Sequence, residues 1–543
     1  MLTPGAPVLR QASVERLDRE AFDVLVLGGG INGAVSAAAL SARGARVALV
    51  ERGDFASSTS QESSNLVWGG IKYLETYEIG LVWKLCHARN RLLRTHPSSV
   101  REIRFYTVHS RGFRHGLWKL TLGTWLYWAL GGCFTRPPRL LTRRRMALEE
   151  PLLALEELDG GIEYSDAYLP DNDARFVWGF VRSALEAGCA ATNYVEALGS
   201  ERQGDGWVTR ARDRASGREL TIRSRLLLNA CGPHADQVNA RDGVATAHHH
   251  VLSKGIHLIV DRLAGPERVL TFFADDGRLF FAIPMGPKTC IGTTDTPVER
   301  PEVEVTAEDR RFVLDNINRR LRLARPLTEG DVIAERCGVR PLAVDRAGGP
   351  VRDWVQLSRR HVIEVDAGRG HLTIFGGKLT DCLNVGEQIC RHVGRLGVAL
   401  PAGRRWYGEP PSAVREEYQA RARALRVDEL SPDAPEPLSA RLWRRHGAGA
   451  AAILEAMARD PRAQVVMPGA GLVRAELERM AEREMVVRLE DFLRRRTSIA
   501  LVVRGEDLRH DPGLREAGRI LFGAAADAKL AEYFAEGAAR ATR

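Results

Sequence analysis

The glycines at 28, 30 and 33 have the spacing of a turn that binds a dinucleotide. Gly28 would make the tight turn, Gly30 would let the backbone approach a pyrophosphate, and Gly33 would let a helix pack closely on a strand. The N-terminus of that helix favours phosphate charge. Glu51 follows at the offset of about 20 residues expected for a carboxylate that binds ribose. Because a carboxylate there disfavours a 2′-phosphate, the pattern predicts FAD or NAD and argues against NADP.

Two later segments favour FAD. Residues 226–232 (LLLNACG) form a predicted strand that ends in small residues and can pass close to a nucleotide. Residues 374–380 (IFGGKLT) predict a strand, a Gly-Gly turn and the start of a helix. A chain that returns twice to one ligand suits an elongated dinucleotide held at both ends. A helix that begins near Gly377 could face the flavin ring, where negative charge develops on reduction.

These residues must be positioned by a βαβ unit at the N-terminus. An apolar run at 22–27, an Ala-rich helical segment at 31–43 and a second apolar run at 45–51 supply that unit. Further buried strands are expected at 226–230 and 371–375. Alternating β-type segments at 251–295 predict an antiparallel sheet, whereas 412–543 has helical periodicity, interrupted by a Pro/Asp cluster at 431–438.

The predicted fold is α/β, with a Rossmann-type FAD-binding domain, an antiparallel β-sheet substrate (cap) domain and an all-helical C-terminal domain. We expect a short N-terminal extension and then segments that alternate between the first two domains. The predicted boundaries are 1–19 for the extension, 20–110, 161–245 and 336–402 for the FAD-binding domain, 111–160 and 246–335 for the substrate domain, and 403–543 for the helical domain.

The composition excludes several classes of protein. The chain has 543 residues and a net charge of +9, and no run of like charges exceeds three residues, so we expect no nucleic-acid binding. The N-terminus lacks the features of a secretory signal and the eight cysteines form no CxxC, which predicts a cytoplasmic enzyme with reduced thiols. We expect no membrane span. The triplet His248–His250 lacks spaced partners and predicts a solvated loop rather than a metal site.

The longest apolar run, at 116–134, allows two interpretations. It contains Trp118, Trp125, Tyr127 and Trp128 and lies between arginines. Aromatic residues with flanking arginines suit a helix that lies in a membrane interface. The alternative is an ordinary buried helix with aromatic packing. The first interpretation would place the enzyme peripherally on the inner face of the cell membrane.

Seven ordered motifs resemble the FAD-dependent glycerol-3-phosphate dehydrogenase family, within the wider D-amino-acid-oxidase-like flavoproteins. They are VLVLGGGINGA (24–34), VERGDFASSTS (50–60), LVWGGIKYLE (66–75), KGIHLIV (254–260), IGTTDT (291–296), GVRPL (338–342) and IFGGKLT (374–380). The tail, with LEDFLRRRT at 489–497, is similar to the family's helical C-terminal domain. The resemblance therefore covers nearly the whole chain.

The resemblance implies an enzyme that acts on CH-OH donors. It would oxidise sn-glycerol 3-phosphate to dihydroxyacetone phosphate, with hydride transfer to FAD and electron transfer to a quinone or another acceptor. In the family's pattern, a group of side chains surrounds a small anionic substrate beside the flavin, at the positions of Lys72, Tyr73, His257, Arg340 and Lys378.

Each of these side chains has a chemical role that suits its type. Lys72 and Arg340 could hold a phosphate or carboxylate. His257 is the candidate base for the hydroxyl proton. Lys378 could polarise the substrate oxygen or stabilise flavin charge, and Tyr73 could hydrogen-bond the substrate. The predicted cofactor-binding residues are Gly28, Gly30, Asn32, Gly33, Glu51, Ser58, Thr59, Ser64, Gly232, Gly376, Lys378, Leu379 and Thr380.

Three positions depart from the family's pattern. Trp68 stands where the family reads His, Lys72 stands in place of Arg, and residues 381–383 (DCL) follow GGKLT where Thr-Tyr-Arg is common. Exchanging Arg for Lys replaces bidentate recognition by a point charge. The alternatives are therefore a related oxidoreductase or oxidase acting on another small hydroxy acid, polyol phosphate or amine, and a flavin-binding protein without catalysis. The sequence leaves the oligomeric state open.

Overall fold

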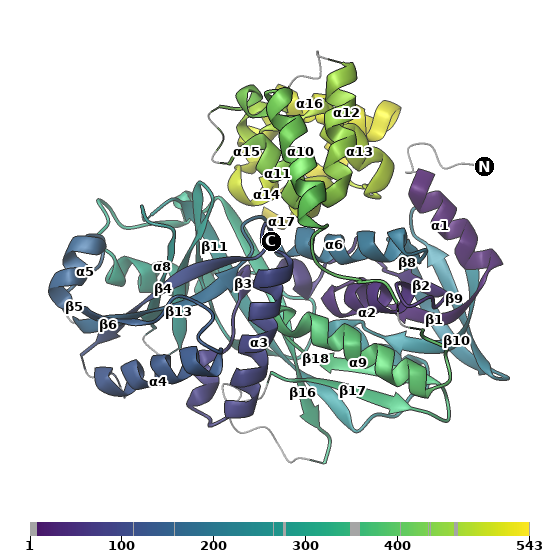
Figure 1. Cartoon of the computed structure of the whole chain (residues 1–543), viewed down its shortest axis with the longest axis horizontal. Helices are drawn as coiled ribbons and strands as arrows, with labels where there is room; N and C mark the ends of the chain where they lie inside the picture. The colour runs from purple at the N-terminus through teal and green to yellow at the C-terminus, as the bar shows by residue number, and fades with distance from the viewer. Residues whose placement is uncertain are drawn as a thin grey trace.

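The computed structural model consists of two large β-sheets with their helices and a mainly helical part at the C-terminus, which contains a third sheet of two strands (Figure 1). It describes residues 8–111, 113, 115–156, 158–263, 265–274, 278–347, 359–401, 403–432, 434, 436–460 and 465–541. The predicted fold class is confirmed, because a sheet with a parallel core, a mainly antiparallel sheet and a mainly helical domain are all present.

The first part, called here the parallel-sheet part, is built on an eight-stranded sheet with the order β17-β18-β10-β1-β2-β7, to which β9 and β8 are attached. β1 pairs in parallel with β2 and with β10, and β10 pairs in parallel with β18. Its strands are β1 (Ala21–Leu27), β2 (Val47–Val50), β7 (Ala190–Thr192), β8 (Val195–Gln203), β9 (Gly206–Asp213), β10 (Glu219–Asn229), β17 (His361–Asp366) and β18 (His371–Gly376).

Helices cover this sheet because its central strands are apolar on both faces. β2 is buried along its whole length, and β1 is buried from Val24 to Leu27. The Ala-rich helix α2 packs against α6 and α9, where small side chains let the helices approach closely. The helices of this part are α1 (Val8–Arg19), α2 (Ile31–Ser41), α6 (Asp173–Glu186), α7 (Ala235–Arg241) and α9 (Cys382–Arg395).

The second part is a ten-stranded sheet with the order β15-β11-β14-β13-β12-β4-β6-β3, to which β16 and β5 are attached. Its pairs are antiparallel except for β12 with β4. The strands are β3 (Leu66–Val67), β4 (Arg101–Ser110), β5 (Arg139–Thr142), β6 (Leu158–Tyr168), β11 (His248–Asp261), β12 (Arg268–Phe273), β13 (Leu279–Met285), β14 (Lys288–Gly292), β15 (Thr296–Val298) and β16 (Ala334–Asp345).

Two sequence-based expectations need correction here. The predicted boundaries at 110, 160 and 335 would assign β4, most of β6 and most of β16 to the FAD-binding domain, but all three strands pair within the ten-stranded sheet. Strand partners far apart in sequence decide this membership, and the local pattern does not reveal them. The triplet His248–His250 forms the half-buried start of β11 rather than a solvated loop.

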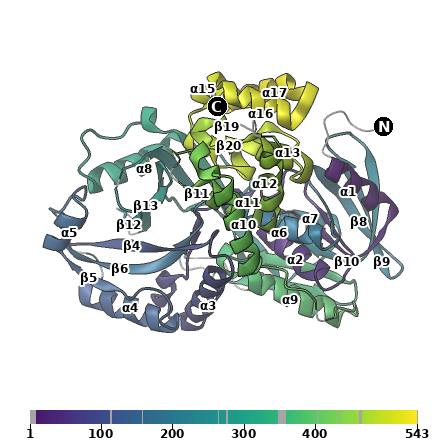
Figure 2. The same ribbon diagram turned by 45° about the horizontal axis from the view of Figure 1, so that its top comes forward.

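Helices α3 (Ile79–Thr95), α4 (Leu117–Leu130), α5 (Arg143–Glu149) and α8 (Ala307–Arg320) accompany the ten-stranded sheet. α4 buries Thr124 and Tyr127 and exposes its opposite face, so it is not the ordinary buried helix of the second interpretation. α3 and α4 lie next to each other, with α3 toward the parallel-sheet part (Figures 1 and 2).

The C-terminal helical part rests on the other two (Figure 2). Its core is built from Leu, Met, Phe and Ile side chains of several short helices. Its elements are α10 (Ser412–Ala424), α11 (Leu438–His446), α12 (Ala450–Arg459), β19 (Val465–Met467), β20 (Leu472–Val473), α13 (Arg474–Arg483), α14 (Ile499–Val502), α15 (Gly505–His510), α16 (Pro512–Phe522) and α17 (Ala526–Ala541). Among the described residues of the whole chain, no helix has the length and apolarity to cross a bilayer.

Candidate active site

A cavity of about 590 Å³ opens at the carboxyl ends of β1 and β10, where α2 begins. The carboxyl edge of a parallel sheet is where doubly wound folds bind nucleotides. Six of the predicted cofactor residues line this cavity: Gly28, Gly30, Glu51, Ser58, Thr59 and Gly232. Ser64 does not line it.

The glycine-rich turn has the geometry that its sequence requires. Gly28 has a φ of +99°, and a Cβ there would lie 2.6 Å from the Ala230 carbonyl oxygen. A Cβ on Gly33 would lie only 1.8 Å from the Gly28 carbonyl oxygen. Both positions therefore need glycine, which keeps the start of α2 tight against the strands.

Glu51 follows the end of β2 and points its carboxylate at this turn. The carboxylate accepts hydrogen bonds from the backbone N–H groups of Gly29 (2.7 Å) and Gly53 (2.9 Å). Burial raises the pKa of Glu51, against the effect of these two bonds. A carboxylate fixed in this way beside the cavity suits a ribose hydroxyl.

The second nucleotide-binding segment lies beside the first. The Asn32 side-chain nitrogen donates to the Gly376 carbonyl oxygen (3.2 Å), and the Gly376 N–H donates to His250 Nε2 (3.0 Å). The Asn32 Oδ1 atom is buried and has no partner among the described residues. Leu379 and Thr380 form a 3₁₀ turn after Lys378, and the Thr380 hydroxyl donates to the Trp68 carbonyl oxygen (3.1 Å).

These features fit FAD. The cavity offers a glycine cradle, a helix N-terminus and a ribose-type carboxylate, and the buried Asn32 Oδ1 needs a hydrogen-bond donor. The turn at 376–377 reaches the same site although it lies 344 positions after Asn32 in the sequence.

His257 lies in the middle of β11 and is almost completely buried, with 3% of its surface exposed. Neither ring nitrogen has a hydrogen-bond partner among the described residues. Burial, together with the charges of Arg340 and Arg336, lowers the pKa of His257 to about 3. The imidazole is therefore neutral at pH 7, and the ring nitrogen that carries no hydrogen is free to accept a hydrogen bond or a proton.

Arg340 lies on β16, which pairs with β11. Its guanidinium donates to the Thr294 carbonyl oxygen (3.1 Å), to Asp295 (3.1 Å) and to the Thr293 hydroxyl (2.9 Å). Burial and the nearby Arg359 lower the pKa of Arg340 to about 10. The side chain is thus held in place and still carries its charge at neutral pH.

Asp295 links Arg340 to two further cations. Arg359 donates to its other oxygen (3.4 Å), and Lys72 is close enough to act on the same carboxylate. Burial, followed by the charge of Arg359, lowers the pKa of Lys72. Three cations around one carboxylate leave an excess of positive charge, which suits a small anion.

Lys378 and Tyr73 complete the group. The Lys378 Nζ atom lies 4.5 Å from the centre of the Tyr73 ring and 5.0 Å from that of Trp68. Burial opposes ionisation of Tyr73, but the charges of Lys378, Arg359 and Lys72 outweigh it and lower the pKa of this phenol. The structure therefore brings together all five side chains that were expected around the substrate.

Sequence reasoning missed two members of this group. Asp295 lies inside the motif IGTTDT, so its place next to two threonines offered a signal. Arg359 lies in no motif, and only the fold brings it to Asp295.

The positions that depart from the family's pattern have their own contacts. The Trp68 indole N–H donates to the Tyr164 hydroxyl (3.4 Å). Asp381 pairs with Lys84 and with His361, each at 2.8 Å. Burial opposes ionisation of Asp381, but these two partners lower the pKa of its carboxyl group.

Two protein families match the chain. The FAD dependent oxidoreductase family matches residues 23–383, and the C-terminal domain of alpha-glycerophosphate oxidase matches residues 403–512. Together they span the two sheets and most of the helical part.

The chain is also similar to individual proteins of known activity or structure. D-erythritol 1-phosphate dehydrogenase of Brucella abortus is 32% identical over 496 residues, covering 88% of this chain and 94% of that protein. Aerobic glycerol-3-phosphate dehydrogenase of Staphylococcus aureus is 31% identical over 391 residues, covering 70% and 68%. The crystal structure of Bacillus halodurans glycerol-3-phosphate dehydrogenase complexed with FAD has the same fold, with a TM-score of 0.70, 24% identity and coverage of 98% and 97%.

Proposed function

Because the chain belongs to the glycerol-3-phosphate dehydrogenase-like family of FAD-dependent oxidoreductases, we propose that it oxidises a hydroxyl group of a small phosphorylated polyol. The first candidate substrate is sn-glycerol 3-phosphate, which would give dihydroxyacetone phosphate. One observation carries the proposal: the neutral, buried His257, which has no hydrogen-bond partner in the described part of the chain, lies close to the cluster of Arg340, Arg359 and Lys72.

The proposed division of labour follows from these positions. Arg340, Arg359 and Lys72 hold the phosphate, and Asp295 keeps the two guanidiniums in place. His257 accepts the hydroxyl proton as the C–H bond breaks. Lys378 stabilises negative charge at the reacting end. A bound FAD would supply the acceptor for the hydride, and a quinone would be the final acceptor of the electrons.

A four-carbon polyol phosphate is the second candidate. Two observations favour it: Trp68 and Lys72 stand where the family has His and Arg, and the erythritol-phosphate enzyme aligns over most of both chains. A lysine in place of arginine gives a less directional phosphate contact, which suits a substrate of different length.

The test is anaerobic mixing of the purified holoenzyme with single compounds near neutral pH, followed by flavin absorbance. We expect glycerol 3-phosphate or erythritol 1-phosphate to bleach the flavin, whereas glycerol, lactate and glycine do not. Faster bleaching by the four-carbon compound would favour the second candidate. In Arg340→Ala, the flavin should remain bound and the phosphorylated compound should bind at least tenfold more weakly, because a charged hydrogen bond contributes about 1.5–3 kcal/mol. Bleaching by an unphosphorylated compound alone would contradict the proposal.

We also propose that α4 rests on the cytoplasmic face of the membrane, where a quinone acceptor is found. Trp118, Leu122, Trp125 and Leu126 recur on one face of α4 and are 44–73% exposed. Tyr77, just before the neighbouring helix α3, and Trp83, within α3, are also exposed. Such a surface suits the boundary between headgroups and acyl chains.

A further inference from the structure

The segment Asp54–Glu62 forms one wall of the cofactor cavity with little regular structure of its own. Its residues 56–60 line the cavity. One short 3₁₀ turn, Thr59–Gln61, is its only regular element, and Ala56 adopts a left-handed conformation with a φ of +67°. Because sheet and helix hydrogen bonds do not fix this wall, contacts from elsewhere must define its shape.

Hydrogen bonds with Gly29, Ile31 and Val339 hold the middle of the segment. Three consecutive arginines of the helical part bind its two ends. They end a π-helical turn, Asp491–Arg496, which precedes α14. Arg496 binds both carboxylate oxygens of Asp54, at 2.7 and 2.9 Å. Such parallel bonds give the pair a fixed orientation.

The other two arginines reach both ends of the segment. Arg495 donates to Asp54 (2.7 Å) and to the Gln61 side-chain oxygen (3.1 Å). Arg494 donates to the Gln61 carbonyl oxygen (2.9 Å) and to Glu62 (3.0 Å). The beginning and the end of the cavity wall are therefore tied to one turn of the helical part.

Burial makes these contacts strongly interdependent. Asp54, Arg495 and Arg496 are each at most 2% exposed. Burial alone would raise the pKa of Asp54, but the two guanidiniums hold it below its ordinary value, so the carboxylate is charged. A buried ion pair is costly to break, because the remaining partner keeps an uncompensated charge.

We propose that Arg494–Arg496 hold the segment Asp54–Glu62 in the shape that retains FAD. The arginines do not line the cavity themselves and act through the segment, as positioning residues. The helical part is thereby a component of the cofactor site. This inference does not depend on which compound the enzyme oxidises.

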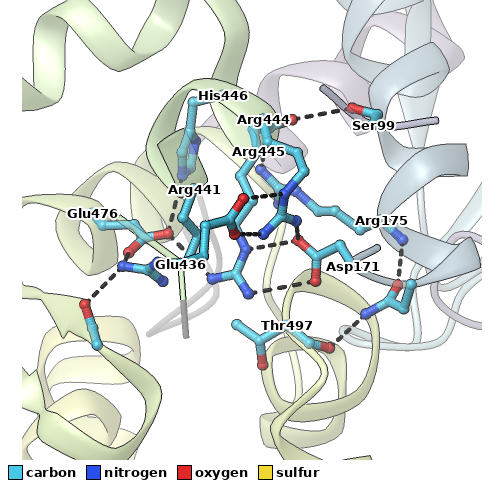
Figure 3. A network of polar contacts seen from close by, with 12 residues as sticks. Ser99, Asp171, Arg175, Glu436, Arg441, Arg444, Arg445, His446, Glu476 and Thr497 are labelled. Atoms are coloured by element: carbon cyan, nitrogen blue, oxygen red, sulfur yellow. Dashed lines mark hydrogen bonds and ion pairs between the residues drawn. The ribbon is translucent and has the colours of Figure 1, made fainter. Parts of the chain in front are cut away.

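A second set of contacts between the same parts of the molecule provides a matched control. The side chain of Arg444 in α11 is only 6% exposed and pairs with Asp171 of the parallel-sheet part and with Glu436, as Figure 3 shows. It joins the helical part to the rest of the chain, as Arg496 does, and has no contact with the segment among the described residues.

The experiment measures how fast FAD leaves the purified holoenzyme after dilution, from the rise in flavin fluorescence. We expect release to be at least tenfold faster in Arg496→Gln than in the wild type. In Arg444→Gln we expect release within threefold of the wild type, even if its Tm falls as far as that of Arg496→Gln.

Arg496→Lys provides a second variant that keeps the charge and loses the paired geometry. We expect it to fold, by circular dichroism, and to release FAD at a rate between those of the wild type and Arg496→Gln. If Arg496→Gln does not fold, the rate of FAD release from Arg496→Lys is the test of the proposal. Wild-type release from a folded Arg496 variant would overturn the proposal. Equally fast release from Arg444→Gln would overturn it too, because general stability would then explain the effect.

Discussion

At the scale of single residues, the most informative side chain is a buried histidine without a hydrogen-bond partner among the described residues. His257 is surrounded by strands, lies close to two arginines and lacks a hydrogen-bond partner for either nitrogen within the described part of the chain. A buried polar group in this condition costs about 1–3 kcal/mol. A substrate hydroxyl would relieve that cost in the step where the imidazole takes the proton.

In His257→Gln, the rate of flavin reduction by the phosphorylated substrate should fall by about 10²–10⁴-fold, because the general base is lost. Flavin content should stay unchanged, since His257 does not line the cofactor cavity. Stopped-flow absorbance measures the rate. His248→Gln, whose histidine pairs with Glu364, is the control and should reduce flavin at the wild-type rate. A nearly normal rate in His257→Gln would assign the base elsewhere.

How much of the site the sequence predicts depends on how local the signal is. The glycine turn and Glu51 are separated by little more than 20 residues, and the structure places both at one cavity. Arg359 and the ion pair between Lys84 and Asp381 could not be predicted, because Arg359 and Lys84 lie in no motif and only the fold brings them to their carboxylate partners. The charge balance around the substrate is therefore a property of the fold.

At the scale of elements, α4 shows why composition alone was ambiguous. An apolar helix of this length can be buried or can lie on a membrane, and the two differ only in what covers it. The structure buries Thr124 and Tyr127 and leaves the tryptophan-bearing face uncovered. The strands of the ten-stranded sheet pose the same problem, because partners far apart in sequence decide to which sheet each belongs.

The element-scale prediction tests this face. Replacing Trp118, Leu122 and Trp125 together by serine should lower the affinity for vesicles that contain anionic lipid by at least 100-fold, as measured by co-sedimentation. Each large side chain contributes about 1.5–3 kcal/mol when it leaves water completely. Flavin content and reduction rate should not change. Leu430→Ser, in the helical part, removes another exposed apolar side chain and should leave vesicle binding intact. If the triple variant sediments like the wild type, α4 is not the membrane contact.

At the scale of the whole molecule, buried histidines link stability to pH. Burial, the first cause in each case, lowers the pKa of His96 and His257 to about 3 and that of His371 to about 4. As the pH falls below about 6.5, these histidines bind protons in the unfolded chain but not in the folded one. The free energy of unfolding is therefore not reduced by these histidines above pH 6.5. It decreases as the pH falls from 6.5 toward their pKa values in the folded protein.

His371 gives the measurable case. Between pH 6.5 and 4.5, the wild type should lose about 2 kcal/mol more of its free energy of unfolding than His371→Gln does, because one suppressed protonation contributes about 1.4 kcal/mol per pH unit. Urea titrations at the two pH values measure this difference. His87→Gln, with an exposed histidine, is the control and should follow the wild type. Parallel pH dependence in His371→Gln and the wild type would contradict the assignment.

The contact between Asp54 and Arg496 spans 442 positions of the chain. The parallel sheet is likewise completed only when β18 joins β10. During synthesis, the glycine turn leaves the ribosome long before the arginines that bind the neighbouring wall. We therefore expect nascent chains that end before residue 490 to retain flavin poorly, and cofactor insertion to be a late event in biogenesis.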